Sequence, residues 1–285
     1  MQPQASTELS RSPSLSVEPY HCAATPETRV EPEVHHRWCL AYVVGGSFGY
    51  RCVGRRAQEL VAGAVLIGRP GEGYLCTHDH HAGGDECLSL EFAPDLAEEL
   101  RLGRLAAGLD HLPPLPELRI WGEIARAATT DDCGVALDEA GLLFALRLVQ
   151  LAESRPVPRR EPSARDRRRA VEAALWIEAH AGEPVGLDDL ARLAYATPLH
   201  FLRVFTRVVG ATPHQYLIRS RLARACRLLA AGDLPVTEVA LAAGFQDLSN
   251  FVRTFQRASG LPPGRLKRAL GDERSFFQVA RRTMG

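Results

Sequence analysis

The sequence lacks an apolar run long enough to cross a bilayer, and its first residues show no basic stretch followed by an apolar one. These absences argue against a membrane-spanning helix and a secretory signal, so no membrane partner is expected. The seven cysteines are odd in number and have no CxxC spacing, unlike a disulfide framework. A reduced, cytoplasmic compartment fits this cysteine pattern best.

Lysine is almost missing, since Lys267 is the only one among 34 Lys and Arg residues. The formal net charge is 0, yet the two halves differ strongly. Residues 1–158 hold 13 basic and 22 acidic residues, a net of −9, whereas residues 159–285 hold 21 and 12, a net of +9. Because nucleic-acid phosphates require neutralising cations, the second half is the candidate for binding them.

That second half contains one short pattern written twice, 50 positions apart. The first copy is Phe201, Arg203, Phe205, Arg207, Gly210, Pro213, and the second is Phe251, Arg253, Phe255, Arg257, Gly260, Pro263. A short helical pattern precedes each copy, over 187–191 and 236–240. Thr197 as N-cap with Pro198 at the first helical position favours a helix start. The arrangement predicts two helix-turn-helix units.

The stretch 169–271 resembles the DNA-binding domain of the AraC/XylS family of bacterial transcription regulators, in which a long helix joins two helix-turn-helix units. Matching residues include Gly210-Ala-Thr-Pro213, Arg221-Leu222, Gly244-Phe245 and Pro262-Pro263. Leu266 and Lys267 depart from the family pattern, where an aromatic followed by Arg is usual. The resemblance implies double-stranded DNA as a partner, RNA polymerase if the protein activates transcription, and a homodimer.

Helical periodicity predicts which side chains face DNA. If Phe201 and Phe205 point inward, the residues about 180° away point outward, and the second unit follows the same rule. The predicted DNA-binding residues are Leu199, Leu202, Arg203, Thr206, Arg207, Ser249, Asn250, Val252, Arg253, Gln256 and Arg257. Arg can pair with guanine and Asn or Gln with adenine, whereas apolar side chains can contact only a thymine methyl group. Because Leu199 and Leu202 flank Arg203, the first helix should discriminate less between bases than the second. Phosphate contact or a solvated face is the alternative for all four arginines: it is as open as base contact for Arg207 and Arg257, whereas base contact is favoured for Arg203 and Arg253.

The first half shows short β-like runs between Gly or Pro turns, which predict a small β-sandwich or barrel over 34–153, with helices over 94–109 and 137–154. The runs are 38–44, 49–53, 58–61, 64–67, 73–77 and 87–92. Residues 60–71 are similar to the strand pair of a cupin barrel. The predicted fold class is α+β with two domains: a cupin-like β-barrel with trailing helices, then an all-α domain. The remaining segments are a disordered tail at 1–33, a linker at 154–168 and a C-terminal tail at 272–285.

Two further features of the first half bear on control. Leu142, Leu143, Leu146 and Val149, interrupted by Gln150, form a stripe that fits either core packing or pairing between two copies. The leading hypothesis is a sequence-specific transcription regulator that a small-molecule effector in the barrel controls by population shift. A ligand-free oligomerisation module is another interpretation of this half.

A His- and Cys-containing segment is the one cluster that could carry chemistry. Cys76, His78 and His80 would share a face of an extended strand, with Cys87 following, and such ligands suit zinc, copper or iron. A polar turn between two strands, a metal or redox sensor and a metal-dependent cupin enzyme remain open. Cupin enzymes place a Glu one residue earlier than Glu86 and add a later His, so no catalytic residue and no cofactor are assigned, and the protein is not expected to be an enzyme.

Overall fold

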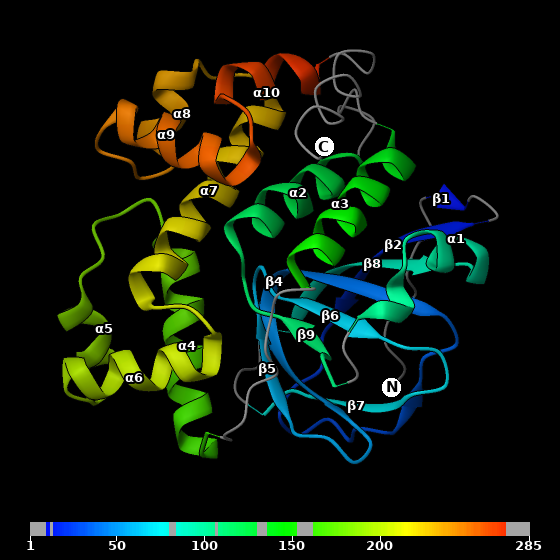
Figure 1. Ribbon diagram of the computed structural model, residues 1–285. Helices are drawn as coiled ribbons and strands as arrows, with labels where there is room; N and C mark the ends of the chain where they lie inside the picture. Colours follow the sequence, from blue (N-terminus) through cyan, green and yellow to red (C-terminus); the bar gives the residue numbers. More distant parts are fainter. Residues whose placement is uncertain are drawn as a thin grey trace.

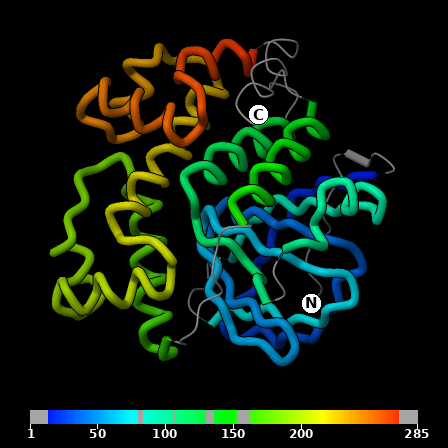
Figure 2. Tube along the Cα trace, in the orientation of Figure 1, coloured from blue at the N-terminus to red at the C-terminus, as the bar shows by residue number. Residues whose placement is uncertain are grey.

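The computed structural model describes residues 10–11, 14–79, 84–105, 108–129, 136–152 and 162–271. A β-rich half lies beside a helical half, and helices α2 (Pro116–Ala127) and α3 (Leu137–Ala152) cover one face of the sheet (Figure 1). The second half meets the first along α2 and the long helix α7 (Pro213–Ala231), as the Cα trace also shows (Figure 2). Within the described ranges, no helix combines the length and apolar character that a bilayer crossing requires.

The described strands form one antiparallel sheet that folds over on itself. Its main path runs β1-β2-β8-β4-β6-β9, while β4 also pairs with β5 and β7, and β7 with β3. The strands are β1 Ser10–Arg11, β2 Leu15–Cys22, β3 Glu33–Val34, β4 Trp38–Cys52, β5 Gln58–Val61, β6 Val65–Gly68, β7 Gly73–Thr77, β8 Asp85–Phe92 and β9 His111–Leu112. The fold is therefore α+β, and β4 is the strand that links the two faces.

Strand β4 passes from one part of the sheet to the other because its register with β8 slips between Val43 and Gly45. Such a bulge bends a strand and increases its twist. Gly46 has φ +75°, and a Cβ there would lie 2.2 Å from the carbonyl oxygen of Gly84. Only glycine fits both constraints, so the bend depends on this position.

The side chains of β4 alternate between two buried layers. Leu40 and Tyr42 join the cluster under α2 and α3, whereas Cys39, Ala41 and Val43 join the cluster on the opposite face. Alternation follows from the two-residue period of a strand. Because both faces are buried, this strand reads as a nearly continuous apolar run.

The N-terminal segment corrects one prediction. Residues from 15 to 22 form β2, paired with β8 over eight positions, and Leu15 and Val17 are 2% and 0% exposed. The predicted disordered tail at 1–33 is therefore wrong for this stretch, while residues 1–9 lie outside the described residues. The runs at 38–44 and 49–53, predicted as separate strands, belong to the single strand β4.

The helices after the sheet also differ from expectation. Among its described residues, the stretch 94–109 contains the short helix α1 (Pro94–Glu99) and the 3-10 turn η1 (Leu102–Arg104) and no longer helix. Helix α2 was not predicted. On α3, Val149 is buried and the stripe's Leu146 is 40% exposed, so the stripe is not a core face as a whole.

The second half consists of seven helices within the described residues: α4 Ala164–Ala179, α5 Leu187–Leu193, α6 Pro198–Val209, α7 Pro213–Ala231, α8 Val236–Ala242, α9 Leu248–Ser259 and α10 Pro263–Leu270. Helix α4 begins with Ser163 as N-cap, so the last five positions of the predicted linker, 164–168, are helical. A capping box between Thr212 and Gln215 starts α7, which spans about 28 Å at 1.5 Å per residue. The departure at Leu266 does not loosen α10, since that side chain is fully buried.

Buried charges join the two halves. The Arg119 side chain on α2 is 0% exposed, and its Nη2 donates to both carboxylate oxygens of Glu178 on α4, at 2.7 and 2.8 Å. Burial opposes the charge of Arg119, yet attraction to Glu178 raises its pKa overall. Glu123, 1% exposed, accepts from Arg227 of α7 at 2.7 Å and from Tyr42 of β4 at 3.2 Å. Helix α2 is thus bonded to the sheet and to the second half.

Candidate nucleic-acid interface

Helix α6 is positioned by its cap and by two phenylalanines. The backbone N–H of His200 donates to Thr197 Oγ1 at 3.4 Å, and Pro198 occupies the first turn, which confirms the predicted start. Phe201 and Phe205 are 1% and 0% exposed and pack in a core shared with α4. The inward face of α6 is therefore the predicted one, and the opposite face points to solvent.

Helix α9 is built in the same way with a charged cap. The Asp247 carboxylate accepts from the backbone N–H groups of Ser249 and Asn250, both at 3.0 Å. Phe251 and Phe255 are both fully buried, in the core that the second unit shares with α2 and the sheet. An N-cap of this kind fixes the first turn, whose residues are the ones that reach base edges in a helix-turn-helix.

All eleven predicted DNA-binding residues lie on the outward side of these two helices. Eight are exposed: Leu199, Arg203, Arg207, Ser249, Asn250, Arg253, Gln256 and Arg257. Three are half-buried: Leu202, Thr206 and Val252. The structure thus gathers six residues on α9 and five on α6, one set on each unit.

Five of the six residues of the α9 set line a shallow hollow at the surface. Its lining consists of Leu248, Ser249, Val252, Arg253, Gln256, Arg257 and Gly260. Leu248, which is 42% exposed, was not among the predicted DNA-binding residues, because an apolar residue at a helix start is normally assigned to the core. The hollow is mostly apolar and is also lined by two arginines, which suits a thymine methyl beside a phosphate or guanine.

Hydrogen bonds restrain the polar groups of α9. Asn250 Oδ1 accepts from Arg253 Nη2 at 3.3 Å and from Thr254 Oγ1 at 3.4 Å. Holding two planar groups together reduces the side-chain freedom that a base contact would have to remove. On α6, by contrast, Thr206 Oγ1 donates to the Leu202 carbonyl at 2.7 Å, so this hydroxyl is already used within the helix.

The turn before α6 carries backbone strain that the turn before α9 avoids. Tyr195 has φ +47° and is 88% exposed, whereas its counterpart Gly244 has φ +93°. A left-handed conformation costs an L-residue roughly 1–2 kcal/mol, and glycine in turn costs some unfolded-state entropy. Tyr195→Gly is therefore expected to raise the free energy of unfolding by about 0.5–1 kcal/mol, measured by urea denaturation. Tyr195→Ala keeps the strain, so an equal gain in that variant would contradict this explanation.

Two short-helix, turn, capped-helix units with exposed polar outer faces, joined by one helix, define a helix-turn-helix DNA-binding protein. Residues 190–269 match the protein family described as "Helix-turn-helix domain". The chain is 32% identical over 92 residues to the HTH-type transcriptional activator AarP of Providencia stuartii, covering 32% of this chain and 68% of that protein. The chain belongs to the AraC/XylS family of DNA-binding transcription regulators.

Two other relatives show how far the similarity extends. The probable transcriptional regulator LumQ of Photobacterium leiognathi is 34% identical over 90 residues, which cover 32% of this chain and 36% of LumQ. The chain thus spans little more than a third of LumQ. The HTH-type transcriptional activator RhaS of Pectobacterium carotovorum subsp. carotovorum is 28% identical over 279 residues, covering 90% of this chain and 93% of that protein. The similarity to RhaS thus extends over most of the chain, whereas the family match covers residues 190–269.

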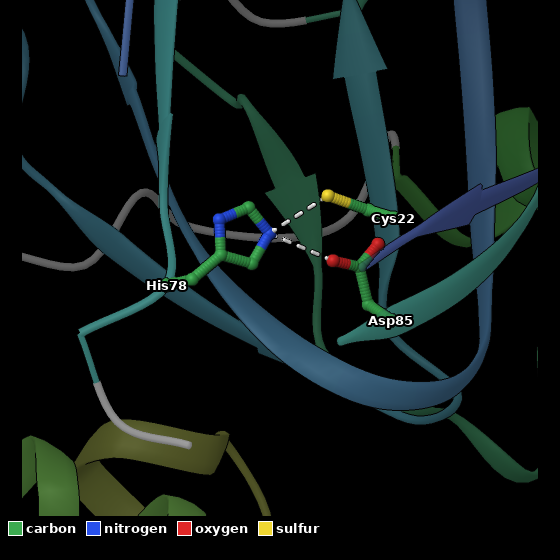
Figure 3. Close-up of side chains that lie close together, drawn as sticks. All are labelled: Cys22, His78 and Asp85. Carbon is green, nitrogen blue, oxygen red and sulfur yellow. Dashed lines mark hydrogen bonds and ion pairs between the residues drawn. The ribbon is translucent and has the colours of Figure 1, made fainter. Parts of the chain in front are cut away.

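The metal-ligand candidates of the first half take a different arrangement from the predicted one. His78 lies beyond the end of β7 and therefore does not continue a strand face with Cys76. His80 lies outside the described residues. His78 Nε2 instead meets Asp85 Oδ1 at 2.9 Å and Cys22 Sγ at 3.4 Å (Figure 3). The expected shared face is wrong for His78, and Cys22 is a contact that sequence spacing did not reveal.

The other two cysteines of that prediction have different surroundings. Cys76 packs beside the apolar cluster that includes Cys87. Cys87 Sγ donates to Asp85 Oδ2 at 3.7 Å, and burial raises the pKa of the Cys87 thiol. Burial likewise raises the pKa of the Cys22 and Cys76 thiols. In the metal-free protein these thiols are therefore protonated at neutral pH.

Proposed function

We propose that one copy of the protein reads two successive segments of the DNA major groove, one with α6 and one with α9. The observation that supports this proposal is the placement of α6 and α9 at opposite ends of α7 (Figure 1), each with exposed residues on its outer face. That helix is about 28 Å long, close to the roughly 34 Å between equivalent points one DNA turn apart. The net charge of +9 on residues 159–285 favours the phosphate contacts that such binding needs.

The two helices have unequal roles in this proposal. On α9, Arg253 and Gln256 can contact guanine and adenine edges, with Asn250 beside Arg253. On α6, Arg203 is flanked by Leu199 and Leu202, which can contact only thymine methyl groups. Arg207 and Arg257, in the last turns of their helices, serve phosphate contacts. Base selection therefore comes mainly from α9, and α6 adds affinity and register.

Control by the sheet half would act through α2. Glu123 bonds to Tyr42 in the sheet and to Arg227 on α7, and the Tyr216 hydroxyl of α7 donates to the Ala62 carbonyl at 3.2 Å. A small molecule bound in a cupin-like barrel would change the relative stability of arrangements in which α2 and α7 are packed or separated. The effector thereby changes how often the two units are placed to contact DNA together.

A second copy of this chain is the other partner we propose for the first half. The support is α3, which leaves Leu146 40% exposed and Leu142 and Leu143 half-buried at its surface. Sedimentation should find a dimer whose dissociation constant rises in Leu146→Arg. A monomeric wild-type protein at micromolar concentration would remove pairing from the proposal without affecting the DNA contacts.

Selection from a random duplex library at about 0.15 M salt tests the proposed function. The full chain should enrich a site with two short conserved blocks about 10 bp apart, centre to centre. In parallel, Arg203→Ala combined with Arg253→Ala should enrich no such pair, while a barrel-surface control, Arg104→Ala, should enrich the wild-type site. Salt-dependent binding without any enriched sequence would reduce the second half to a phosphate binder.

A further inference from the structure

A buried group of three metal-type ligands lies at one end of the sheet, away from the DNA-binding helices. Cys22 ends β2, Asp85 begins β8, and these two residues are direct partners in the β2–β8 ladder. His78 approaches from the segment after β7, and its side chain points at both (Figure 3). The ligand atoms of all three residues lie within 4.8 Å of one another.

A glycine allows the backbones of Cys22 and Asp85 to approach closely. Gly84, next to Asp85, has φ +70°, and a Cβ there would lie 2.1 Å from the Cys22 carbonyl oxygen. The close approach of these two backbone segments at this point therefore requires glycine. Because the backbone fixes the separation of Cys22 and Asp85, their side chains converge on His78 without long flexible stems.

Among the described residues, the Asp85 carboxylate pairs with His78 and with no arginine or lysine. His78 and Asp85 are 7% and 8% exposed, and no arginine or lysine among the described residues contacts either of them or Cys22. A carboxylate so deeply buried is costly unless a positive charge compensates it. On metal binding the Cys22 thiol would release its proton, and the resulting thiolate and the Asp85 carboxylate would together balance the charge of one divalent cation.

A second group with metal-type ligands provides the contrast. Cys52, Glu72 and Asp110 also lie close together. There, Arg55 forms ion pairs with Glu72 and Asp110, and Arg69 lies 3.5 Å from Asp110. Guanidinium groups already neutralise those carboxylates, so their charge does not require a metal ion.

The distances fit the coordination sphere of zinc. With Zn–N of about 2.05 Å, Zn–S of about 2.3 Å and tetrahedral angles, N and S ligands stand about 3.5 Å apart, and N and O ligands about 3.4 Å apart. The observed separations are 3.4 Å for His78 Nε2 to Cys22 Sγ and 2.9 Å for His78 Nε2 to Asp85 Oδ1. A carboxylate shift of about half an ångström would complete the geometry.

We propose that Cys22, His78 and Asp85 bind one divalent transition-metal ion of the zinc type, through Sγ, Nε2 and a carboxylate oxygen. Three protein ligands leave a fourth tetrahedral position for a water molecule. The ion would connect the end of β2 to the start of β8 and to the segment after β7. The proposal is independent of the DNA contacts of α6 and α9.

Cobalt spectroscopy on the full chain tests this site. Chelator-treated, reduced protein titrated with Co²⁺ should show tetrahedral visible bands and a thiolate-to-cobalt band that saturate at one equivalent and disappear when Zn²⁺ is added. Cys22→Ser should remove the thiolate band, and His78→Gln or Asp85→Asn should weaken binding by at least about 10- to 100-fold. Cys39→Ser is the matched control, because the Cys39 thiol is buried and pairs with Ser89 at 3.4 Å instead.

Alkylation keeps the proposal testable if a variant does not fold. In the wild-type protein, Zn²⁺ should protect Cys22 from iodoacetamide, as mass spectrometry of its peptide would show. The proposal is overturned if Co²⁺ gives no thiolate band at one equivalent, if that band persists in folded Cys22→Ser, or if Zn²⁺ leaves the alkylation of Cys22 unchanged.

Discussion

Glu178→Gln is expected to lower the free energy of unfolding by about 3 kcal/mol, the largest effect of any single substitution at the junction of the two halves. Its partner Arg119 is 0% exposed and donates to both carboxylate oxygens of Glu178. Two other nitrogens of Arg119, Nε and Nη1, are buried without a partner among the described residues. The variant therefore leaves a buried cation without its counter-charge. Urea denaturation followed by circular dichroism measures the change.

Three further variants separate this charge effect from a general packing effect. Arg119→Met removes the buried cation, while Glu178, which is 21% exposed in the wild-type protein, still accepts from Ser220. This variant should therefore lower the free energy of unfolding by less than Glu178→Gln does. Combining the two substitutions should recover most of the loss. Glu123→Gln should cost only about 1 kcal/mol, because Arg126 and Arg227 remain 31% and 37% exposed and can be hydrated. Additive losses in the Arg119 and Glu178 pair would contradict the explanation.

Arg253→Ala is expected to weaken binding to the selected DNA site about 10- to 100-fold and to relax base preference at one position. A bidentate Arg–guanine pair is worth about 1–3 kcal/mol of discrimination, which corresponds to this range. The side chain is exposed on the outward face of α9 and is held by Asn250 at 3.3 Å. Fluorescence anisotropy with the selected site and its single-base variants measures both effects.

Arg257→Ala provides the matched comparison on the same helix. A phosphate contact carries no sequence information, so this variant should weaken binding to all duplexes about equally. The slope of log binding constant against log salt concentration should decrease in magnitude by about 1. Arg104→Ala removes the same charge from the surface of the sheet half and should change neither property. If Arg253→Ala weakens all sequences equally, Arg253 is a phosphate contact and the assignment of base selection to α9 fails.

The DNA-binding helices could be predicted because their sequence constraints are local. Phe201, Phe205, Phe251 and Phe255 repeat at the helical spacing, and each helix is a short amphipathic segment with one buried face. Caps such as Thr197 act over three residues, so they too are visible in the sequence. Which side chains face outward follows directly from these anchors.

The features that could not be predicted depend on distant parts of the chain. Strand β2 shows only a brief alternation at Leu15 and Val17 before Pro19, and its eight partners on β8 lie about 70 residues later. Helix α2 buries Arg119 and Glu123, and charged residues such as these are normally assigned to the surface when only the sequence is known. The buried face of α2 was therefore not recognisable. Cys22 meets His78 across 56 positions, a separation that no motif spacing encodes.

Moving the two halves of the selected DNA site apart tests whether one copy of the protein reads both conserved blocks. Because the 19 residues of α7 fix the distance between α6 and α9, inserting either 5 or 10 bp between the two conserved blocks should reduce affinity to the non-specific level. Specific and non-specific affinities typically differ by about 10³-fold or more, so the loss is easily measured by anisotropy. If affinity survives the 5 bp insertion, or returns with 10 bp, one copy does not read both blocks, and α7 does not set the spacing of the two contacts.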